Sequence, residues 1–318
     1  MPSKKSPRKG SLQYWPRKRA AKFLPRVNWN AINSDTKGLK GFICYKAGMF
    51  SAYLKDNTPN SLTKGKKVTI PTTLIECPPM KIFSARFYKD KIVVKEILAE
   101  NPEKELKRKI KIPKKKGGNL DEMKKEEFDD VSVLCYSVIK KTGIKKTPDM
   151  SEIGLGGNID EKINFIKENL GKEMHFTDFF RKGGLIDVRG LTKGKGLQGP
   201  VKRFGIRLKQ HKSEKGVRRP GSLGPWHPAR VTFRVPMAGQ LGMFTRVSYN
   251  HNIIENGNSE KNPQKFLKNI KNFGEIKTEF SILNGSIQGP AKRQMIITYP
   301  LRKTKKQEKK SYEFIELR

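Results

Sequence analysis

The sequence predicts a mainly β fold, interrupted by a segment of mixed charge and extended by two strongly basic stretches. Runs rich in Val, Thr, Ile and Phe, broken by Gly and Pro, recur along the chain as short strands do. Half of the 30 acidic residues lie between residues 94 and 170. The basic stretches hold almost no acid. A β scaffold, an insertion and basic extensions are therefore the expected parts.

The strand patterns form one block before the mixed-charge segment and one block after it. Residues 39–58 and 66–90 are expected to form short strands of a barrel or a sandwich, because β-branched and aromatic residues alternate with glycine and proline breaks. The patterns resume at 184–192, 229–235, 243–254 and 276–300. From Ala229 to Val235 apolar residues alternate with Arg and Thr, which predicts a half-buried strand.

The segment between the two blocks, residues 94–180, has a different composition. Residues 94–170 carry 17 basic and 15 acidic residues, so their charges nearly cancel. Helical patterns are expected at 93–110, 119–141 and 158–171. This insertion should face solvent or protein. Its run from Lys107 to Lys116, with seven cations in ten residues, is either a solvated loop or a further phosphate contact.

The N-terminal 26 residues carry nine cations and no acid. Such a segment cannot bury enough apolar surface to fold alone, and we expect it to become ordered on a partner. A solvated tail is the alternative, but Tyr14 and Trp15 could stack on bases. The segment has no apolar run of the kind found in secretory signals. Its cations are Lys4, Lys5, Arg8, Lys9, Arg17, Lys18, Arg19, Lys22 and Arg26.

A second basic stretch spans residues 189–230, with twelve cations and the single acid Glu214. It reads as a long loop that leaves the β scaffold. Gly194, Gly196 and Gly199 within it match the G-x-G-x-x-G pattern of dinucleotide sites. That pattern requires a crossover helix and a downstream acid, and a proline follows the last glycine here. We therefore expect no cofactor, and interpret the glycines as backbone that approaches phosphates closely.

Two near-identical turns, QGPVKR at 198–203 and QGPAKR at 288–293, place a Lys-Arg pair after Gly-Pro. Both pairs are candidate phosphate contacts, and a shared solubilising turn is the alternative.

Trp226 lies in the stretch SLGPWHPARVTF, between Gly224-Pro225 and His227-Pro228. It could be a buried anchor that closes a turn. Its position in an acid-poor stretch favours an exposed indole that stacks on RNA.

The chain offers no catalytic or metal-ligating pattern. Cys44, Cys77 and Cys135 are far apart, which excludes zinc-knuckle spacing and indicates a reducing compartment. His175 and Asp178 lack a nucleophile motif nearby, and His175 is expected at a helix end or in the core.

The net charge of +38 requires a polyanionic partner, and nucleic acid is the expected one. A membrane is not expected, because the chain has no long apolar run. An RNA-modifying enzyme would need a cofactor loop or an acid–base pair. A packaging protein would not need a Trp-bearing loop beside a mixed-charge domain.

Several motifs in order resemble the universal large-subunit ribosomal protein three family, in its archaeal and eukaryotic form. They are PRKGSLQYWPRKRA, RGLTKGKGLQGPVKRFG, RRPGSLGPWHPARV, MAGQLGMFTR and SIQGPAKR. The resemblance implies a closed six-stranded β-barrel of the translation-protein type with an α/β, largely helical, insertion and long basic extensions. It also implies a non-enzymatic, cytoplasmic constituent of the large ribosomal subunit, which binds the 3′ region of its RNA early in assembly.

The resemblance further implies how the chain is divided. Residues 1–30 would be an RNA-binding extension, 31–93 and 181–300 the two parts of the barrel, 94–180 the insertion, and 301–318 a basic C-terminal segment. The loop 189–240, with Trp226 at its tip, would approach the peptidyl transferase centre. Expected partners are large-subunit RNA and neighbouring ribosomal proteins, with no membrane, cofactor, metal or small-molecule substrate. Candidate RNA-binding residues are Lys9, Trp15, Arg17, Lys18, Arg19, Lys193, Lys195, Gly196, Lys202, Arg203, Arg218, Arg219, Trp226, His227, Arg230, Lys292 and Arg293.

Overall fold

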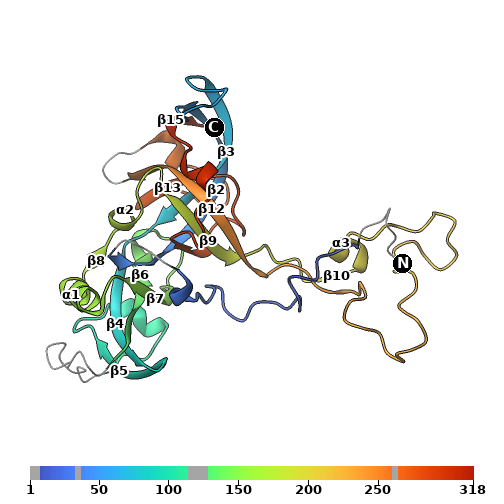
Figure 1. Ribbon diagram of the computed structural model, residues 1–318, viewed down its shortest axis with the longest axis horizontal. Coiled ribbons are helices and arrows are strands. Elements are labelled where there is room, and N and C mark those ends of the chain that lie inside the picture. The colour runs from blue at the N-terminus through green and yellow to red at the C-terminus, as the bar shows by residue number, and fades with distance from the viewer. Residues whose placement is uncertain (1–7, 33–36, 114–127, 260–263) are drawn as a thin grey trace. The chain divides into compact units, whose positions relative to one another are not determined.

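A computed structural model describes residues 8–32, 37–113, 128–259 and 264–318. The chain divides into two compact units (Figure 1). Unit 1 consists of residues 1–22 and 191–246, and unit 2 of residues 23–190 and 247–318. Three predicted features lie outside the described residues: Lys4 and Lys5 of the N-terminal segment, Lys114 to Lys116 of the basic run, and residues 119–127 of an expected helix.

The larger sheet contains seven strands in the order β14-β9-β12-β13-β3-β2-β15. Strand β14 also pairs with β2, for example at Ile296 and Ile43, as well as with β9. The first half of β2, from Gly41 to Ala47, is buried throughout, as expected for a strand that is paired on both sides. The strands are β2 (Gly41–Asp56), β3 (Lys67–Cys77), β9 (Leu185–Leu191), β12 (Thr245–Asn258), β13 (Glu279–Asn284), β14 (Gln294–Thr298) and β15 (Tyr312–Leu317).

A second sheet in unit 2 contains six strands in the order β1-β7-β6-β4-β5, with β8 paired to β4. One face of it packs on α1 (Ile159–Asn169) through Ile163 and Ile166. The capping box of Asn158 and Glu161 starts this helix, which confirms the helix expected at 158–171. The strands are β1 (Gly38–Leu39), β4 (Met80–Lys89), β5 (Ile92–Leu98), β6 (Asp130–Ser137), β7 (Met150–Gly156) and β8 (Glu173–Met174).

The remaining elements of unit 2 are short. They are the 3-10 helices η1 (Trp29–Ala31), η2 (Lys104–Arg108), η5 (Ile139–Lys141) and η6 (Lys265–Leu267), and the α-helices α2 (Phe176–Phe179) and α4 (Lys305–Glu308). The prediction of a mainly β protein is confirmed. So are strands in the ranges 66–90, 184–192, 243–254 and 276–300. The expectation of a pair of short strands at 39–58 is wrong, because residues Gly41–Asp56 form the single long strand β2.

Two expected helices in the insertion are wrong. Residues 93–110 form most of strand β5 and then η2, and residues 130–137 form β6. The β-branched residues Val93, Val94, Val131 and Val133 prefer an extended backbone, and β6 pairs with strands on both sides. Residues 94–180 therefore contain strands as well as α1.

The strand expected at 229–235 is also wrong, because the chain there has no regular secondary structure. Val231 and Phe233 are 50% and 65% exposed. The alternation of apolar residues is present in the sequence, but no neighbouring strand pairs with the segment. A strand without a pairing partner is not stable in water.

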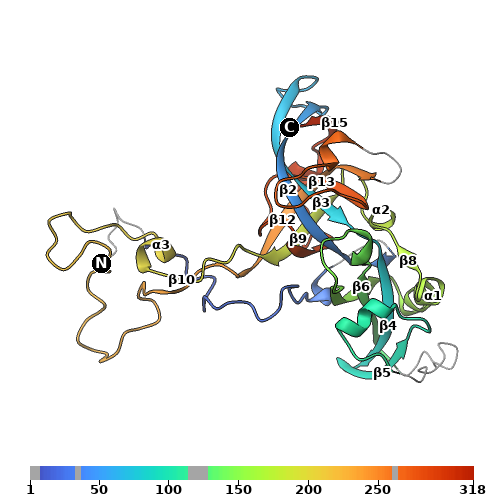
Figure 2. The ribbon, with the colours of Figure 1, turned by 180° about the vertical axis from the view of Figure 1, so that it is seen from behind.

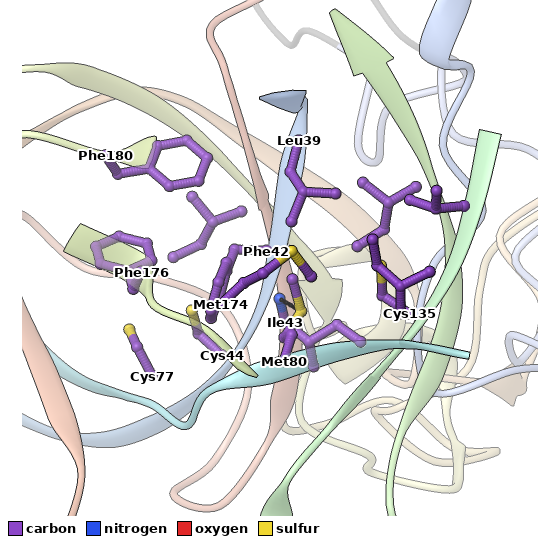
Figure 3. Packing of buried hydrophobic residues seen from close by; sticks show 14 of the residues in the cluster. Leu39, Phe42, Ile43, Cys44, Cys77, Met80, Cys135, Met174, Phe176 and Phe180 are labelled. Carbon is purple, nitrogen blue, oxygen red and sulfur yellow. Dashed lines mark hydrogen bonds between the residues drawn. The ribbon is translucent and has the colours of Figure 1, made fainter. Parts of the chain in front are cut away.

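The main core of unit 2 lies between its two sheets. Figure 3 shows Leu39, Phe42 and Met80 packed in its centre, with Phe176 and Phe180 beside them. Phe176 stacks on Phe180 with ring centroids 5.0 Å apart, and Phe42 meets Phe176 edge to face at 5.5 Å. The three cysteines are buried in this core as free thiols, so they serve as small apolar side chains.

Candidate nucleic-acid interface

The positive charge of the protein is least balanced in unit 1. Its residues, 1–22 and 191–246, contain 21 of the 68 Lys and Arg residues but only one of the 30 Asp and Glu residues, Glu214. Within the described part of unit 1 no side-chain ion pair is formed, whereas unit 2 contains many. The cations of unit 1 must therefore be held by other groups or remain exposed.

In unit 1 a short ladder of backbone hydrogen bonds joins two segments of the chain, residues 192–198 and residues 239–244. Strand β10 (Leu197–Gln198) pairs with β11 (Gly239–Gln240). Next to it, Lys195 N donates to Leu241 O at 2.9 Å, and Thr192 N donates to Phe244 O at 3.0 Å. Gly242 has a φ of +78°, and a Cβ there would overlap the carbonyl oxygen of Lys193. Only glycine fits at this crossing.

Helix α3 (Pro200–Phe204) follows the glycine-rich motif directly. Pro200 occupies its first position and Gly205 ends it in the left-handed conformation, with a φ of 67°. The motif's glycines precede a two-residue strand and a five-residue helix rather than a crossover helix. Gly196 has a φ of 62° and open space where a Cβ would stand, so its backbone is accessible. A close approach of phosphate to this backbone stays a prediction.

An aromatic and arginine cluster ties the N-terminal segment to this ladder. The Trp15 ring stacks on Phe204 at 5.8 Å and meets Phe233 edge to face at 5.6 Å. The Arg17 guanidinium lies over Phe204 at 4.2 Å and donates to Arg203 O at 2.8 Å. Trp15 Nε1 donates to Ser11 O at 2.7 Å. Trp15 and Arg17 are thus half-buried parts of the protein's own packing.

Arg203 holds the returning chain in place. Its Nε donates to Gln240 O at 3.0 Å, and its Nη1 donates to Met237 O at 3.0 Å. Burial lowers the pKa of this guanidinium. A Cβ at Gly239 would lie 2.8 Å from the guanidinium, so glycine is needed for this close approach. The geometry of Arg203 is that of a clamp on the backbone of residues 237–240.

Two further arginines use the same chemistry and were not among the predicted site residues. Arg246 lies over the Tyr14 ring at 4.2 Å and over Phe244 at 5.2 Å. Arg8 Nη2 donates to Arg234 O at 2.5 Å. A sequence signal did exist, since Phe204, Phe233 and Phe244 each lie next to or two residues from an arginine in a chain poor in acids.

Six other cations of unit 1 that were predicted to bind RNA are exposed. They are Lys9, Lys18, Arg19, Lys193, Lys195 and Lys202. No carboxylate in the described residues pairs with them, so they can meet an external anion at little cost in desolvation.

Residues 206–238 contain no helix or strand. Every residue from 221 to 230 is exposed, and Trp226 is 86% exposed. The hydroxyl of Ser222 bonds the backbone of Gly224, and the His227–Pro228 peptide is cis. The structure thus presents the Trp226 indole to solvent rather than burying it as an anchor. The predicted residues Arg218, Arg219, His227 and Arg230 are exposed in the same segment.

The second QGPxKR turn lies in unit 2 and differs from the first. There Arg293 N donates to Pro290 O, and the chain turns into β14, whereas the first copy forms α3. The buried Lys46 donates to Ile287 O and Gly289 O and so supports this turn. Lys292 is exposed, while Arg293 is half-buried, 5.1 Å from the centroid of the Phe23 ring. Burial lowers the pKa of Arg293.

His175 precedes α2 as its N-cap, as expected for a helix-end histidine. Its Nδ1 lies 3.1 Å from Glu279 Oε1, and its backbone N donates to Asp178. Among the described residues, no group of three or more His, Cys, Asp or Glu side chains is arranged to hold a metal ion. No helix in the same residues is long and apolar enough to span a membrane.

Comparison with known proteins identifies close relatives over nearly the whole chain. The family model of ribosomal protein L3 matches residues 1–318. Large ribosomal subunit protein uL3 of Methanocaldococcus jannaschii is 41% identical over 312 residues, which cover 93% of this chain and 91% of the relative. The uL3 proteins of Pyrobaculum calidifontis and Archaeoglobus fulgidus are each 39% identical and cover 94% and 90% of this chain. These alignments cover 93% and 89% of those two relatives.

Proposed function

The chain belongs to the ribosomal protein L3 family, and we propose from this that it is a non-enzymatic structural constituent of the large ribosomal subunit, bound to its RNA in the cytoplasm. The observation that carries the proposal is the charge of unit 1, with 21 cations and one acid. The cations of such a unit repel one another, and a bound polyanion relieves that repulsion. Neighbouring large-subunit proteins are the expected protein partners.

Unit 1 binds RNA in two ways in this proposal. The exposed lysines and arginines contact phosphates, which position the protein without reading sequence. The exposed Trp226 indole stacks on unpaired bases near the peptidyl transferase centre. Trp15, Arg17 and Arg203 act mainly by shaping unit 1, because their side chains already have protein partners.

Salt-dependent binding tests the phosphate contacts. The full chain with Lys193, Lys195 and Lys202 changed to Gln is compared with a matched variant of three ion-paired lysines, Lys140, Lys182 and Lys268. Affinity for the 3′ region of large-subunit RNA is measured from low to high salt. The slope of log affinity on log salt should fall by roughly 2–3 in the first variant only, about 0.7–0.9 for each lost contact. Equal slopes in both variants would contradict the phosphate contacts.

Substitution of Trp226 tests the second mode. Subunits that carry Trp226→Ala should assemble normally but show altered peptide-bond formation, because the side chain contributes stacking rather than folding. Trp226→Phe keeps an aromatic face and should retain most activity. Normal peptidyl transfer in the Ala variant would remove Trp226 from this role.

We also propose that the large sheet of unit 2 is a closed six-stranded barrel. Support comes from its pairings, which run from β2 through β14, β9, β12, β13 and β3 and return to β2. The barrel, the α/β insertion of residues 94–180 and the extensions 1–30 and 189–240 are the proposed parts of the chain. Early binding during subunit assembly would follow from the many phosphate contacts.

A further inference from the structure

Unit 2 carries a second cationic surface that lies outside the candidate interface. It is formed by the loop between β2 and β3 and by the segment that leads into β15, and we call it the C-terminal basic surface. Figures 1 and 2 show the β2–β3 hairpin and β15 at the same end of unit 2. Its exposed cations are Lys64, Lys66, Lys67, Arg302, Lys303, Lys305, Lys306 and Lys309.

Buried polar groups fix the backbone of residues 301–304, which belong to the segment that leads into β15. Asp187 is fully buried, and its carboxylate accepts hydrogen bonds from Asn250 N at 2.8 Å and Leu301 N at 2.9 Å. Asn250 Nδ2 in turn donates to Arg302 O at 2.9 Å and to Thr304 Oγ1 at 3.0 Å. The segment 301–304 is therefore fixed from below, while its charged side chains remain free to face outward.

The β2–β3 loop is organised in a similar way. Asp56 is 5% exposed, and its carboxylate accepts hydrogen bonds from Thr58 N at 2.9 Å and from the hydroxyls of Ser61 and Thr63. Hydrogen bonds from Thr58, Thr63 and Ser61 lower the pKa of Asp56 despite its burial. Asp56 therefore stays ionised and keeps this loop, with its three lysines, in one conformation.

Direct contacts join the loop to the C-terminal segment. Asn57 N donates to Ser311 O at 2.9 Å, and Ser311 N donates to Thr58 Oγ1 at 3.2 Å. The β15 strand then pairs with β2, with Tyr312 opposite Asp56. The cations of the two segments thus form one preorganised surface rather than two mobile tails.

We propose that the C-terminal basic surface is a second phosphate-contacting surface for RNA, separate from unit 1. This inference rests on the proposed function, because it assumes the same polyanion. Within the described residues none of the eight cations forms an ion pair with a carboxylate, whereas exposed lysines elsewhere in unit 2, such as Lys140 and Lys182, do. Seven of the eight are lysines, which bind phosphate as point charges.

An acidic protein partner fits this surface less well. Protein interfaces have an apolar or aromatic centre that supplies most of the affinity. Here the exposed large apolar residues are Leu62 in the loop, Leu301 and Ile315, and Tyr312 at the junction of the two segments packs against the core. Regularly exposed lysines on a fixed backbone are typical of contacts to a phosphate chain.

The test compares two variants of the full chain that lose the same charge. In one, Lys303, Lys305, Lys306 and Lys309 are changed to Gln. In the other, the ion-paired Lys140, Lys141, Lys182 and Lys268 are changed to Gln. Binding to protein-free large-subunit RNA is measured against salt, and hydroxyl-radical footprints are recorded with each variant.

The first variant should lower the salt slope by about 3, or 0.7–0.9 for each contact. It should also lose one patch of RNA protection that the control retains and that variants of unit 1 retain. An unchanged slope and an unchanged footprint would overturn the inference. The same result is expected if the surface binds a ribosomal protein instead of RNA. If the wild-type chain bound no large-subunit RNA, the proposed function itself would fail. The two failures are therefore distinguishable.

Discussion

The two units hold their cations by different chemistry. Unit 2 pairs lysines and arginines with carboxylates, as Arg86 does with Glu152 and Lys162 with Asp130. Unit 1 has one acid, and Arg17, Arg203 and Arg246 in it lie on aromatic rings or donate to backbone carbonyls. A cationic unit can therefore fold without neutralising itself, and it keeps its net charge available for a polyanion. Arginine contacts with aromatic rings and carbonyl oxygens stabilise unit 1, and ion pairs stabilise unit 2.

The largest expected effect is at Gly242, where the two chains of unit 1 cross. Gly242→Ala would strain a φ of +78° and drive a Cβ into Lys193 O, at a cost of roughly 3 kcal/mol in local stability. Gly196→Ala, at a φ of +62° with open space around it, should cost about 1 kcal/mol. Amide hydrogen exchange at Leu241 and Lys195 measures the difference. Equal protection in both variants would show that this crossing does not hold unit 1 together.

Arg203 tests whether charge or geometry holds unit 1. Arg203→Ala should destabilise the chain at residues 237–240 by about 2 kcal/mol, because several backbone carbonyls lose a charged donor. Arg203→Lys keeps the charge but cannot donate to these carbonyls in the fork geometry, so it should restore little. Trypsin cleavage in unit 1, measured as a rate, reports on both. Full rescue by Lys would mean that charge alone matters.

The two tryptophans of unit 1, Trp15 and Trp226, differ in what their side chains do: Trp15 packs against other residues, whereas Trp226 is exposed. Trp15→Ala removes contacts with Phe204 and Phe233 and should destabilise unit 1 by about 1–2 kcal/mol. Trp226→Ala should change its stability by less than about 0.5 kcal/mol, because the side chain is 86% exposed. Both are checked by hydrogen exchange of the RNA-free chain. If Trp226→Ala lowered the stability as much as Trp15→Ala does, the prediction that Trp226 has no packing role would be contradicted.

The dependence of stability on pH is a smaller effect, and it should appear in unit 2 only. Burial raises the pKa of Glu152, but hydrogen bonds from Tyr88 and Ser132 and the charge of Arg86 outweigh it and lower the pKa overall. Glu173, beside Lys141 and Lys81, shows the same net lowering. Their stabilisation is present above the unfolded pKa, near 4.5, and is lost as pH falls through the lower folded pKa. Hydrogen exchange should show weaker protection of β7 below pH 4, with β10 and β11 unchanged.

Glu76 in unit 2 responds in the opposite direction. Burial raises its pKa from 4.5 to about 7, despite hydrogen bonds from Lys277 N and Thr278 N. The folded state therefore favours the protonated form, and its stabilisation is full below pH 4.5 and lost as pH rises toward 7. Glu76→Gln should remove this loss of unfolding free energy between pH 4.5 and 7. A profile between pH 5 and 8 that is identical to wild type would contradict the assignment.

Much of the division of the chain could be predicted, because it depends on composition. Acid depletion in residues 1–26 and 189–230 marks both segments of unit 1, and β-branched runs mark most strands. The helices expected at 93–110 and 119–141 failed because charge spacing imitated a helical face while Val93, Val131 and Val133 paired in a sheet. The strand expected at 229–235 failed because its alternation had no partner.

The roles of individual site residues could be predicted only in part. Trp226 was expected to be exposed from its acid-poor surroundings, and it is. The interior roles of Trp15, Arg17 and Arg203 depend on contacts with Phe204, Phe233 and Gln240, which are far away in sequence. No local pattern reports such contacts. Likewise, QGPVKR and QGPAKR are nearly identical, yet one continues into a helix and the other into a strand.

The packing of Trp15 and Arg17 has a consequence for synthesis of the chain. Arg17 is separated from its acceptor on Arg203 by 186 positions. At about 5–20 residues per second, its partner is made roughly 10–40 s after it. During that interval Trp15 and Arg17 lack their partners Phe204, Phe233 and Arg203. The packing of unit 1 therefore completes only after residues near 203 and 233 have been made, although it uses side chains that were made first.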